Sequence, residues 1–252
     1  MLTDGALMCR STVRIVLGMA LATWLTHVVI TDPAQAQPRA VIELFTSQGC
    51  SSCPPADRLL AELARDPSLV ALSWHIDYWD YLGWKDTFSQ RAFTARQKAY
   101  ASVGGNGEVY TPQVVVNGGP QMVGSDRSEI DAAVSNRRGS ELTVPVTLDG
   151  TGSSVRVSIG PAPAADLQTG TLYLLPVLRS RDVAIGGGEN ANHAVTYTNV
   201  VRAIRPLTTW TGEAKSLDVP LDKMGDSDGY FVLLQSGSPK SPGVVLGAAK
   251  GP

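Results

Sequence analysis

Two cysteines separated by two residues, Cys50-Ser51-Ser52-Cys53, constrain this chain more than any other feature. The apolar run 40–45 precedes them and is typical of a buried strand, whereas the segment 56–64 follows them and is typical of a helix. Two cysteines with this spacing at a strand-to-helix turn form the arrangement used for thiol–disulfide exchange. The motif therefore predicts a redox-active pair at the start of a helix.

Residues 1–36 predict a secretory signal peptide. Two arginines precede an apolar run from 15 to 25, and Ala34-Gln35-Ala36 is a small-residue cleavage site. The apolar run is shorter than the roughly 20 residues that span a bilayer, although an uncleaved anchor remains the alternative. Cleavage after Ala36 removes one of the three cysteines. We therefore expect a periplasmic or secreted protein, in a compartment where disulfides persist.

The charge of the chain limits its partners. A net charge of −2 without a cluster of Lys and Arg provides no footprint for nucleic acid or for an anionic membrane. We expect neither as a partner once the signal is cleaved. No bound organic cofactor and no metal ion is predicted. The expected partners are a protein or small-molecule thiol or disulfide substrate and an external redox partner.

The residue pattern changes near position 139. Before it, strand-like and helix-like segments alternate, and after it helical periodicity is almost absent. The predicted fold class is an α/β domain over residues 37–139, followed by an all-β antiparallel sandwich over residues 140–252. The expected strands are 39–45, 69–77, 110–118, 121–124, 142–148, 154–159, 171–179, 193–205 and 229–234, and the expected helices are 56–64, 85–102 and 127–138.

Residues 39–138 resemble the thioredoxin fold. The shared order is strand, Cys-x-x-Cys, helix, strand, helix, Thr-Pro strand, hairpin and helix. In this fold a cis-proline opens the strand that faces the redox pair, so the resemblance implies a cis peptide bond between Thr111 and Pro112. It also implies that Thr111 contacts the substrate backbone. Gly49 stands where ordinary thioredoxins have Trp, which points away from a general disulfide reductase.

Longer strings are similar to the domain-of-unknown-function 1223 family of secreted bacterial proteins. They occupy residues 43–57, 75–86 and 110–113, and the resemblance covers most of the mature chain, including the β-rich second half. The resemblance implies a thioredoxin-like α/β fold in an exported protein. It implies less about activity, because the function of the family is not established.

The two cysteines receive different roles. Cys50 is the predicted attacking thiolate, because free N–H groups and the positive dipole end of a helix stabilise a negative sulfur. Cys53, one turn further, faces inward and resolves the mixed disulfide. The resemblance to thioredoxins implies a buried carboxylate near this position, and Glu43 fills that role as proton acceptor for Cys53 if the loop 46–49 is one residue longer here. Burial would raise its pKa into the range needed. The alternative places Glu43 on an edge strand facing solvent.

An aromatic and acidic stretch follows the second expected strand. Tyr78, Trp79 and Trp84 are predicted to line a substrate groove together with Thr111 and Pro112, because aromatic side chains offer large contact areas at low entropic cost. The alternative is that these aromatic side chains pack under a loop.

The predicted function is an exported thioredoxin-like thiol–disulfide oxidoreductase. A fixed disulfide in a non-catalytic binding or structural protein is one alternative. Closing a loop of four residues stabilises a fold by only about 2 kcal/mol, against about 3 kcal/mol for 15 residues, which favours the redox interpretation. A copper-binding protein is the other alternative, with Cys50, Cys53 and His75 as soft ligands.

Overall fold

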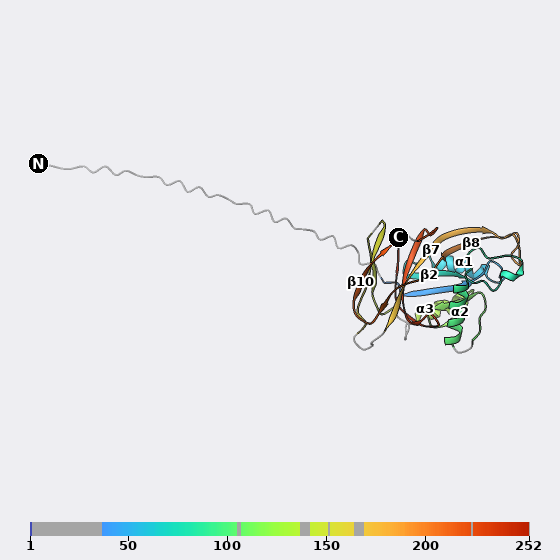
Figure 1. The fold of residues 1–252 in the computed structure, drawn as a ribbon, viewed down its shortest axis with the longest axis horizontal. Coiled ribbons are helices and arrows are strands. Elements are labelled where there is room, and N and C mark those ends of the chain that lie inside the picture. Colours follow the sequence, from blue (N-terminus) through green and yellow to red (C-terminus); the bar gives the residue numbers. More distant parts are fainter. Residues whose placement is uncertain are drawn as a thin grey trace. The chain divides into compact units, whose positions relative to one another are not determined.

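A computed structural model describes Met1 and residues 37–104, 107–136, 142–150, 152–163, 169–222 and 224–251 (Figure 1). The predicted signal peptide and its cleavage site lie outside the described residues, apart from Met1. Residues 35–252 belong to one compact unit. Within the ranges described, no helix has the length and apolar character needed to cross a membrane.

Strands and helices alternate up to α3, and strands follow from there on, as the sequence pattern predicts. The elements are β1 (Ala40–Thr46), α1 (Pro54–Leu63), β2 (Leu69–His75), the 3-10 helix η1 (Asp80–Leu82), α2 (Arg91–Val103), β3 (Gln113–Val116), β4 (Gln121–Val123), α3 (Arg127–Ser135), β5 (Val146–Asp149), β6 (Ser154–Ile159), β7 (Gly170–Ala184), β8 (Ala194–Val201), β9 (Arg205–Trp210), β10 (Lys215–Pro220), β11 (Gly229–Ser238) and β12 (Ser241–Lys250).

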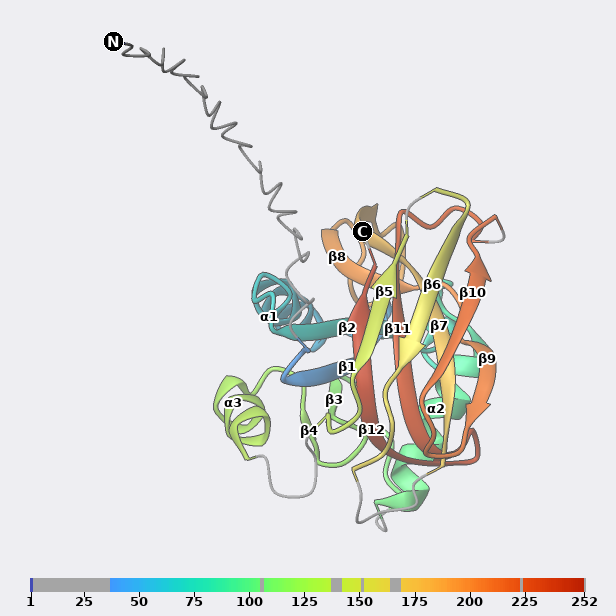
Figure 2. The same ribbon diagram turned by 90° about the vertical axis from the view of Figure 1, so that its left-hand side faces the viewer.

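Most strands belong to one mixed sheet of nine strands. Its order is β12-β11-β7-β8-β2-β1-β3-β4, with β9 paired to β7, whereas β10, β6 and β5 form a separate sheet of three. The first half of the chain joins the second where β2 and β8 run parallel, with Ser73 opposite Val200. Figure 2 shows the small sheet in front of β11 and β7.

The predicted fold class is therefore wrong. We expected an α/β thioredoxin-like domain and a separate antiparallel sandwich, but strands from both halves share one sheet. The physical reason lies in strands such as β11, which is apolar on both faces. Phe231 and Leu233 enter one core, and Val232 and Leu234 enter another. A strand with two apolar faces needs cover on both sides, which a central place in a large sheet provides.

The helices cover the sheet in a pattern that β1 sets. Because successive side chains of a strand point to opposite faces, Val41 and Phe45 pack on the side of α2, and Ile42 and Leu44 pack on the side of α1 and α3. Figure 2 shows α1 and α3 on one side of β1 and α2 on the other. The carboxyl end of β1 leads directly into the two cysteines.

Candidate functional site

Cys50 and Cys53 form a disulfide between the end of β1 and the start of α1. Their Cα atoms are 5.4 Å apart, and the two residues are 2 % and 0 % exposed. The carbonyl of Cys53 accepts hydrogen bonds from the N–H groups of Ala56 and Asp57, at 2.9 and 3.1 Å, which begin the helix. The pair thus lies at the strand-to-helix turn that the sequence predicted.

Thr111 and Pro112 lie beside this pair. The hydroxyl of Ser52 donates to the carbonyl of Thr111 at 3.3 Å and lies 3.4 Å from the Cys50 sulfur. The peptide bond between Thr111 and Pro112 is cis, which confirms what the resemblance implied. The structure therefore brings these two predicted residues together with the cysteines.

Trp79 forms one wall of the site. Its Nε1 donates to the Thr111 hydroxyl at 2.7 Å. A Cβ at Gly49 would lie 3.2 Å from the Cβ of Trp79, so a glycine lets the loop approach the indole closely. Tyr81 stacks on Trp79 with ring centroids 6.4 Å apart and is 77 % exposed. Tyr81 is not among the residues predicted from the sequence.

Tyr78 and Trp84 are more enclosed than Tyr81. Tyr78 packs against the core on the α2 side, with its ring 6.0 Å from that of Trp79. The Nε1 of Trp84 donates to Oε1 of Gln48 at 2.8 Å. Both side chains are half-buried, and their substrate-binding role stays a prediction.

Glu43 faces α2. It shares this face of β1 with Val41 and Phe45 because of the strand alternation. Its carboxylate accepts hydrogen bonds from Nε and Nη2 of Arg96 at 2.7 and 2.9 Å, and from the Tyr100 hydroxyl at 2.6 Å. Glu43 is fully buried, and α1 lies on the opposite face of the sheet. Its role as proton acceptor for Cys53 stays a prediction.

A second buried carboxyl group, Asp57, was missed from the sequence. It is 3 % exposed, and its Oδ1 accepts a hydrogen bond of 2.8 Å from the hydroxyl of Thr46. Its Oδ2 is buried and has no hydrogen-bond partner among the described residues. Burial raises the pKa of Asp57 to about 7, against the opposing effects of the His75 charge and the Thr46 hydrogen bond. Its spacing of four from Cys53 is the signal that could have revealed it.

His75 and Asp86 form a buried pair below the loop. Nδ1 of His75 lies 2.7 Å from Oδ2 of Asp86, which also accepts from the N–H of Gln48 at 2.8 Å. Burial opposes ionisation of Asp86, but the His75 charge and these hydrogen bonds outweigh it and lower its pKa. Hydrogen bonds from Phe88 and Ser89 to Asp86 hold residues 86–89 in a turn, so the helix expected from 85 begins at Arg91.

The loop between β7 and β8, residues 185–193, closes over the cysteines, and we call it the strap. Nδ2 of Asn190 donates to the carbonyls of Gln48 and Cys50, both at 2.9 Å. The N–H of Ser51 donates to Oε2 of Glu189 at 3.2 Å, and hydrogen bonding by Ser51 lowers the pKa of Glu189. Asn190 lies 140 residues beyond Cys50, so no local pattern in the sequence could reveal this contact.

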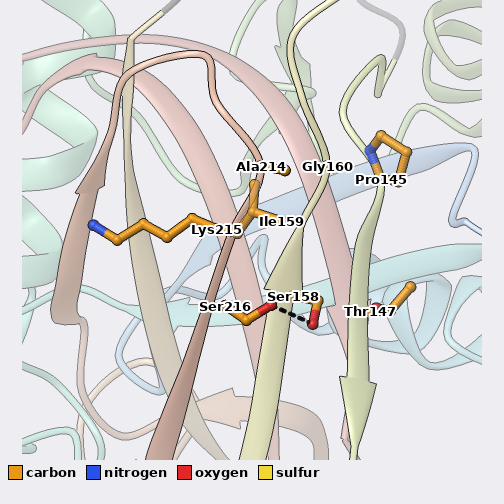
Figure 3. Close-up of a pocket in the computed structure, with 8 residues that line it drawn as sticks. All are labelled: Pro145, Thr147, Ser158, Ile159, Gly160, Ala214, Lys215 and Ser216. Atoms are coloured by element: carbon orange, nitrogen blue, oxygen red, sulfur yellow. Dashed lines mark hydrogen bonds between the residues drawn. The ribbon is translucent and has the colours of Figure 1, made fainter.

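Two pockets lie elsewhere. One, of about 360 Å³, crosses the three-stranded sheet (Figure 3) and is lined by Pro145, Thr147, Ser158, Ile159, Gly160, Ala214, Lys215 and Ser216. The other, of about 400 Å³, is lined by residues of α1 and β8 and by Arg65. Neither is lined by a cysteine. Within the ranges that the structure describes, no group of three or more His, Cys, Asp or Glu residues is placed to hold a metal ion.

Comparison with protein families matches residues 41–235 to the family described as "Protein of unknown function (DUF1223)". The chain belongs to the DUF1223 family. The matched region of this DUF1223 protein contains the cysteines, Asp57 and the strap. A search of curated proteins found no match.

Two solved structures are similar to this DUF1223 protein. The crystal structure of protein AGR_C_4864 from Agrobacterium tumefaciens is 32 % identical, with a TM-score of 0.75, and the match covers 86 % of this chain and 96 % of the other. HBP35 of Porphyromonas gingivalis is 12 % identical, with a TM-score of 0.56, and the match covers 86 % and 76 % of the two chains. The second likeness concerns the fold alone.

Proposed function

We propose that this DUF1223 protein exchanges thiols and disulfides through Cys50 and Cys53. The observation that carries the proposal is a disulfide across four residues at the start of α1, next to a buried carboxyl group of raised pKa. A disulfide across so short a loop contributes only about 2 kcal/mol as a staple. The predicted signal peptide supports action in the periplasm or outside the cell, where such a pair cycles with an external redox partner.

The exchange takes two steps. The Cys50 thiolate attacks a substrate disulfide, forming a bond between Cys50 and one substrate sulfur and releasing the other as a thiolate. Cys53 then attacks the Cys50 sulfur, which closes the Cys50–Cys53 disulfide and releases the second substrate thiolate. The substrate disulfide is reduced by two electrons and the cysteine pair is oxidised by two. The external partner restores the dithiol, and each step is reversible.

Cys53 must lose its proton to act, and Asp57 is the better supported acceptor. The N–H of Asp57 donates to the carbonyl of Cys53, so the two residues lie one helical turn apart on one face. A carboxyl group with a pKa near 7 accepts a proton readily and releases it again at neutral pH. Glu43, by contrast, is held by Arg96 on the other face of the sheet.

The substrate is proposed to lie over Thr111 and Trp79. The hydrogen bond between these two side chains fixes the indole beside the cysteine loop, and the exposed ring of Tyr81 extends the surface. We also propose that Pro112 contacts the substrate, as the sequence predicted. The chemistry of the surface suits a peptide or small molecule that carries a disulfide next to an apolar group.

The reduction potential of the Cys50–Cys53 couple tests the proposal. We expect a value between about −120 and −270 mV, the range of catalytic pairs. We also expect Cys53→Ser to accumulate mixed disulfides with substrate, because the resolving thiol is gone, and the matched control Cys50→Ser to accumulate none. A potential below about −300 mV together with no trapped adduct would contradict the proposal, because structural disulfides lie there.

One observation favours a second candidate, a binding or structural protein with a fixed disulfide. Cys50 is only 2 % exposed, so a substrate thiol or disulfide does not reach its sulfur without movement of the loop. The potential measurement separates the two candidates. The strap contributes to this burial, because Asn190 binds the carbonyl of Cys50.

A further inference from the structure

The strap is bound to the cysteine loop by three hydrogen bonds. Asn190, itself 3 % exposed, uses Nδ2 to bind two loop carbonyls, and Glu189 accepts from the N–H of Ser51. The glycines of the strap rest on Trp84 and on the turn before it: a Cβ at Gly187 would lie 2.6 Å from the carbonyl oxygen of Gly83. The strap is therefore held by the cysteine loop and by the turn that contains Gly83 and Trp84.

The start of α1 offers Cys50 few free backbone N–H groups. Proline lacks an N–H, and Pro54 and Pro55 occupy the first two positions of α1, where a helix normally presents free donors to a thiolate. The N–H of Cys53 already donates to the carbonyl of Cys50 at 3.2 Å. Ser51 therefore carries a scarce donor, and a carboxylate from the second half of the chain takes it.

We propose that Glu189 and Asn190 are positioning residues that make the Cys50–Cys53 couple more reducing. Glu189 places a like charge beside the Cys50 thiolate, and its hydrogen bond from the Ser51 N–H holds that charge at the loop. Asn190 anchors the strap so that Glu189 stays over Ser51. The reduced state loses stability and the disulfide gains by comparison. This inference rests on the proposed function, because it assigns a direction to the same pair.

The other charged groups around the loop are buried, whereas Glu189 is exposed. Asp57 lies on α1, and the His75–Asp86 pair lies beneath Gln48. All three are buried and respond little to salt, whereas Glu189 is exposed and is screened by ions within a Debye length of about 10 Å at 0.1 M. Salt dependence therefore separates the effect of Glu189 from theirs.

The test compares Glu189→Gln with Glu213→Gln in the full mature chain. Both variants remove one exposed negative charge, but Glu213 lies between β9 and β10 and has no part in the loop. Equilibration with glutathione buffers gives the dithiol–disulfide equilibrium constant, and the pH dependence of alkylation gives the pKa of Cys50. We expect Glu189→Gln to favour the dithiol by about two- to fivefold at low salt, with a lower Cys50 pKa, and the shift to shrink at 1 M salt.

Asn190→Ala gives a second measurement. If Asn190 acts by holding Glu189 in place, the double variant Asn190→Ala/Glu189→Gln shifts the equilibrium no further than Asn190→Ala alone. Glu189→Gln is a surface change, so it decides the matter even if Asn190→Ala does not fold.

Equal equilibrium constants for Glu189→Gln and Glu213→Gln, or a shift that salt leaves unchanged, would overturn the inference. The proposed function fails by a different result, a wild-type potential below about −300 mV with no mixed disulfide. Because the glutathione equilibrium is measured without a substrate, the comparison of variants stands in either case.

Discussion

Asp57 buries a carboxyl group on the apolar face of α1 and leaves one oxygen without a hydrogen-bond partner among the described residues. Such a group is rare in folded proteins, because burial without a partner is costly and few functions need it. Groups with a strongly shifted pKa are therefore found mainly at functional sites, where the shift serves the chemistry. The N–H of Asp57 bonds to the carbonyl of Cys53, the residue whose thiol must lose a proton in the proposed exchange.

The substitution Asp57→Asn tests the cost of this burial. The folded pKa of about 7 lies above the ordinary value of 3.8, so the folded state binds the proton more tightly than the unfolded chain. This contributes stability that is fully present below about pH 4 and is lost as the pH rises through 7. We expect Asp57→Asn to have a higher free energy of unfolding than wild type at pH 8, by on the order of a few kcal/mol, and a similar one at pH 4.

Urea unfolding at the two pH values measures this difference, with the exposed Asp222→Asn as the matched control. Equal stability of Asp57→Asn and wild type at pH 8 would show that the carboxyl group is not desolvated. The same variant also tests whether Asp57, rather than Glu43, accepts the proton of Cys53. Asp57→Asn should slow the release of a substrate thiol by Cys53 at pH 7, because the proposed proton acceptor of the resolving thiol is then missing.

At this scale the sequence predicts what is local. Cys50 and Cys53 were found because their spacing and their flanking segments are contiguous, and the cis bond before Pro112 followed from the resemblance. Asp57 was within reach through its spacing from Cys53. Glu189 was not, because the approach of the strap to Ser51 depends on the pairing of β7 and β8.

At the scale of elements, α2 is held to the sheet by a buried ionic cluster. Arg96 bridges Glu43 on β1 and Gln235 on β11, and its guanidinium lies 5.0 Å from the ring centroid of Trp74. An amphipathic pattern predicts that α2 packs on a sheet, but the partners of a polar residue on its buried face come from strands far along the chain. The cluster ties an element of the first half to a strand of the second.

Arg96→Met should therefore be strongly destabilising. It leaves the carboxylate of Glu43 buried without its cation, which costs about 3–5 kcal/mol in comparable pairs. The double variant Arg96→Met/Glu43→Leu should regain much of this loss, because neither charge then remains. Denaturant titrations of the three proteins measure both effects. A loss below 1 kcal/mol for Arg96→Met would mean that water reaches Glu43 in the variant.

The run of apolar residues in β11 explains why the predicted fold class differs from the structure. We expected the second half to form a separate antiparallel sandwich, in which each strand turns one face toward solvent. Residues 230–234 of β11 are Tyr-Phe-Val-Leu-Leu, apolar throughout, and the structure buries them all. An unbroken apolar run of this kind predicts a strand that is covered on both faces. The first and last residues of a strand do not by themselves indicate which of its faces are covered.

At the scale of the whole molecule, one core is shared between the halves. Residues of β1, β2 and α2 pack with residues of β7, β11 and β12 in a single cluster. The alternation of elements in the first half was predicted correctly, but the pairing of β2 with β8 depends on contacts across more than 100 residues. The domain boundary at 139/140 stays a prediction. The shared core predicts how the first half behaves without the second.

The isolated segment 37–139 should not fold. Without β7, β11 and β12, the face of β1 and β2 under α2 loses much of its apolar cover, and Arg96 loses Gln235. We expect the segment to show neither dispersed amide resonances nor a cooperative thermal transition, whereas the chain from residue 37 to 252 shows a single transition. A segment 37–139 that unfolds cooperatively would establish two independent domains.

The place of β8 beside β2 also affects how the protein is made. β8 begins about 120 residues after the end of β2, and no other described strand pairs with that edge. At ~5–20 residues per second, a ribosome takes roughly 6–24 s to supply it. During that interval the apolar segments of the first half stay without their partners, and exposed apolar segments are where nascent chains associate. A protein built this way depends on a chaperone or on delayed collapse until its last third has emerged.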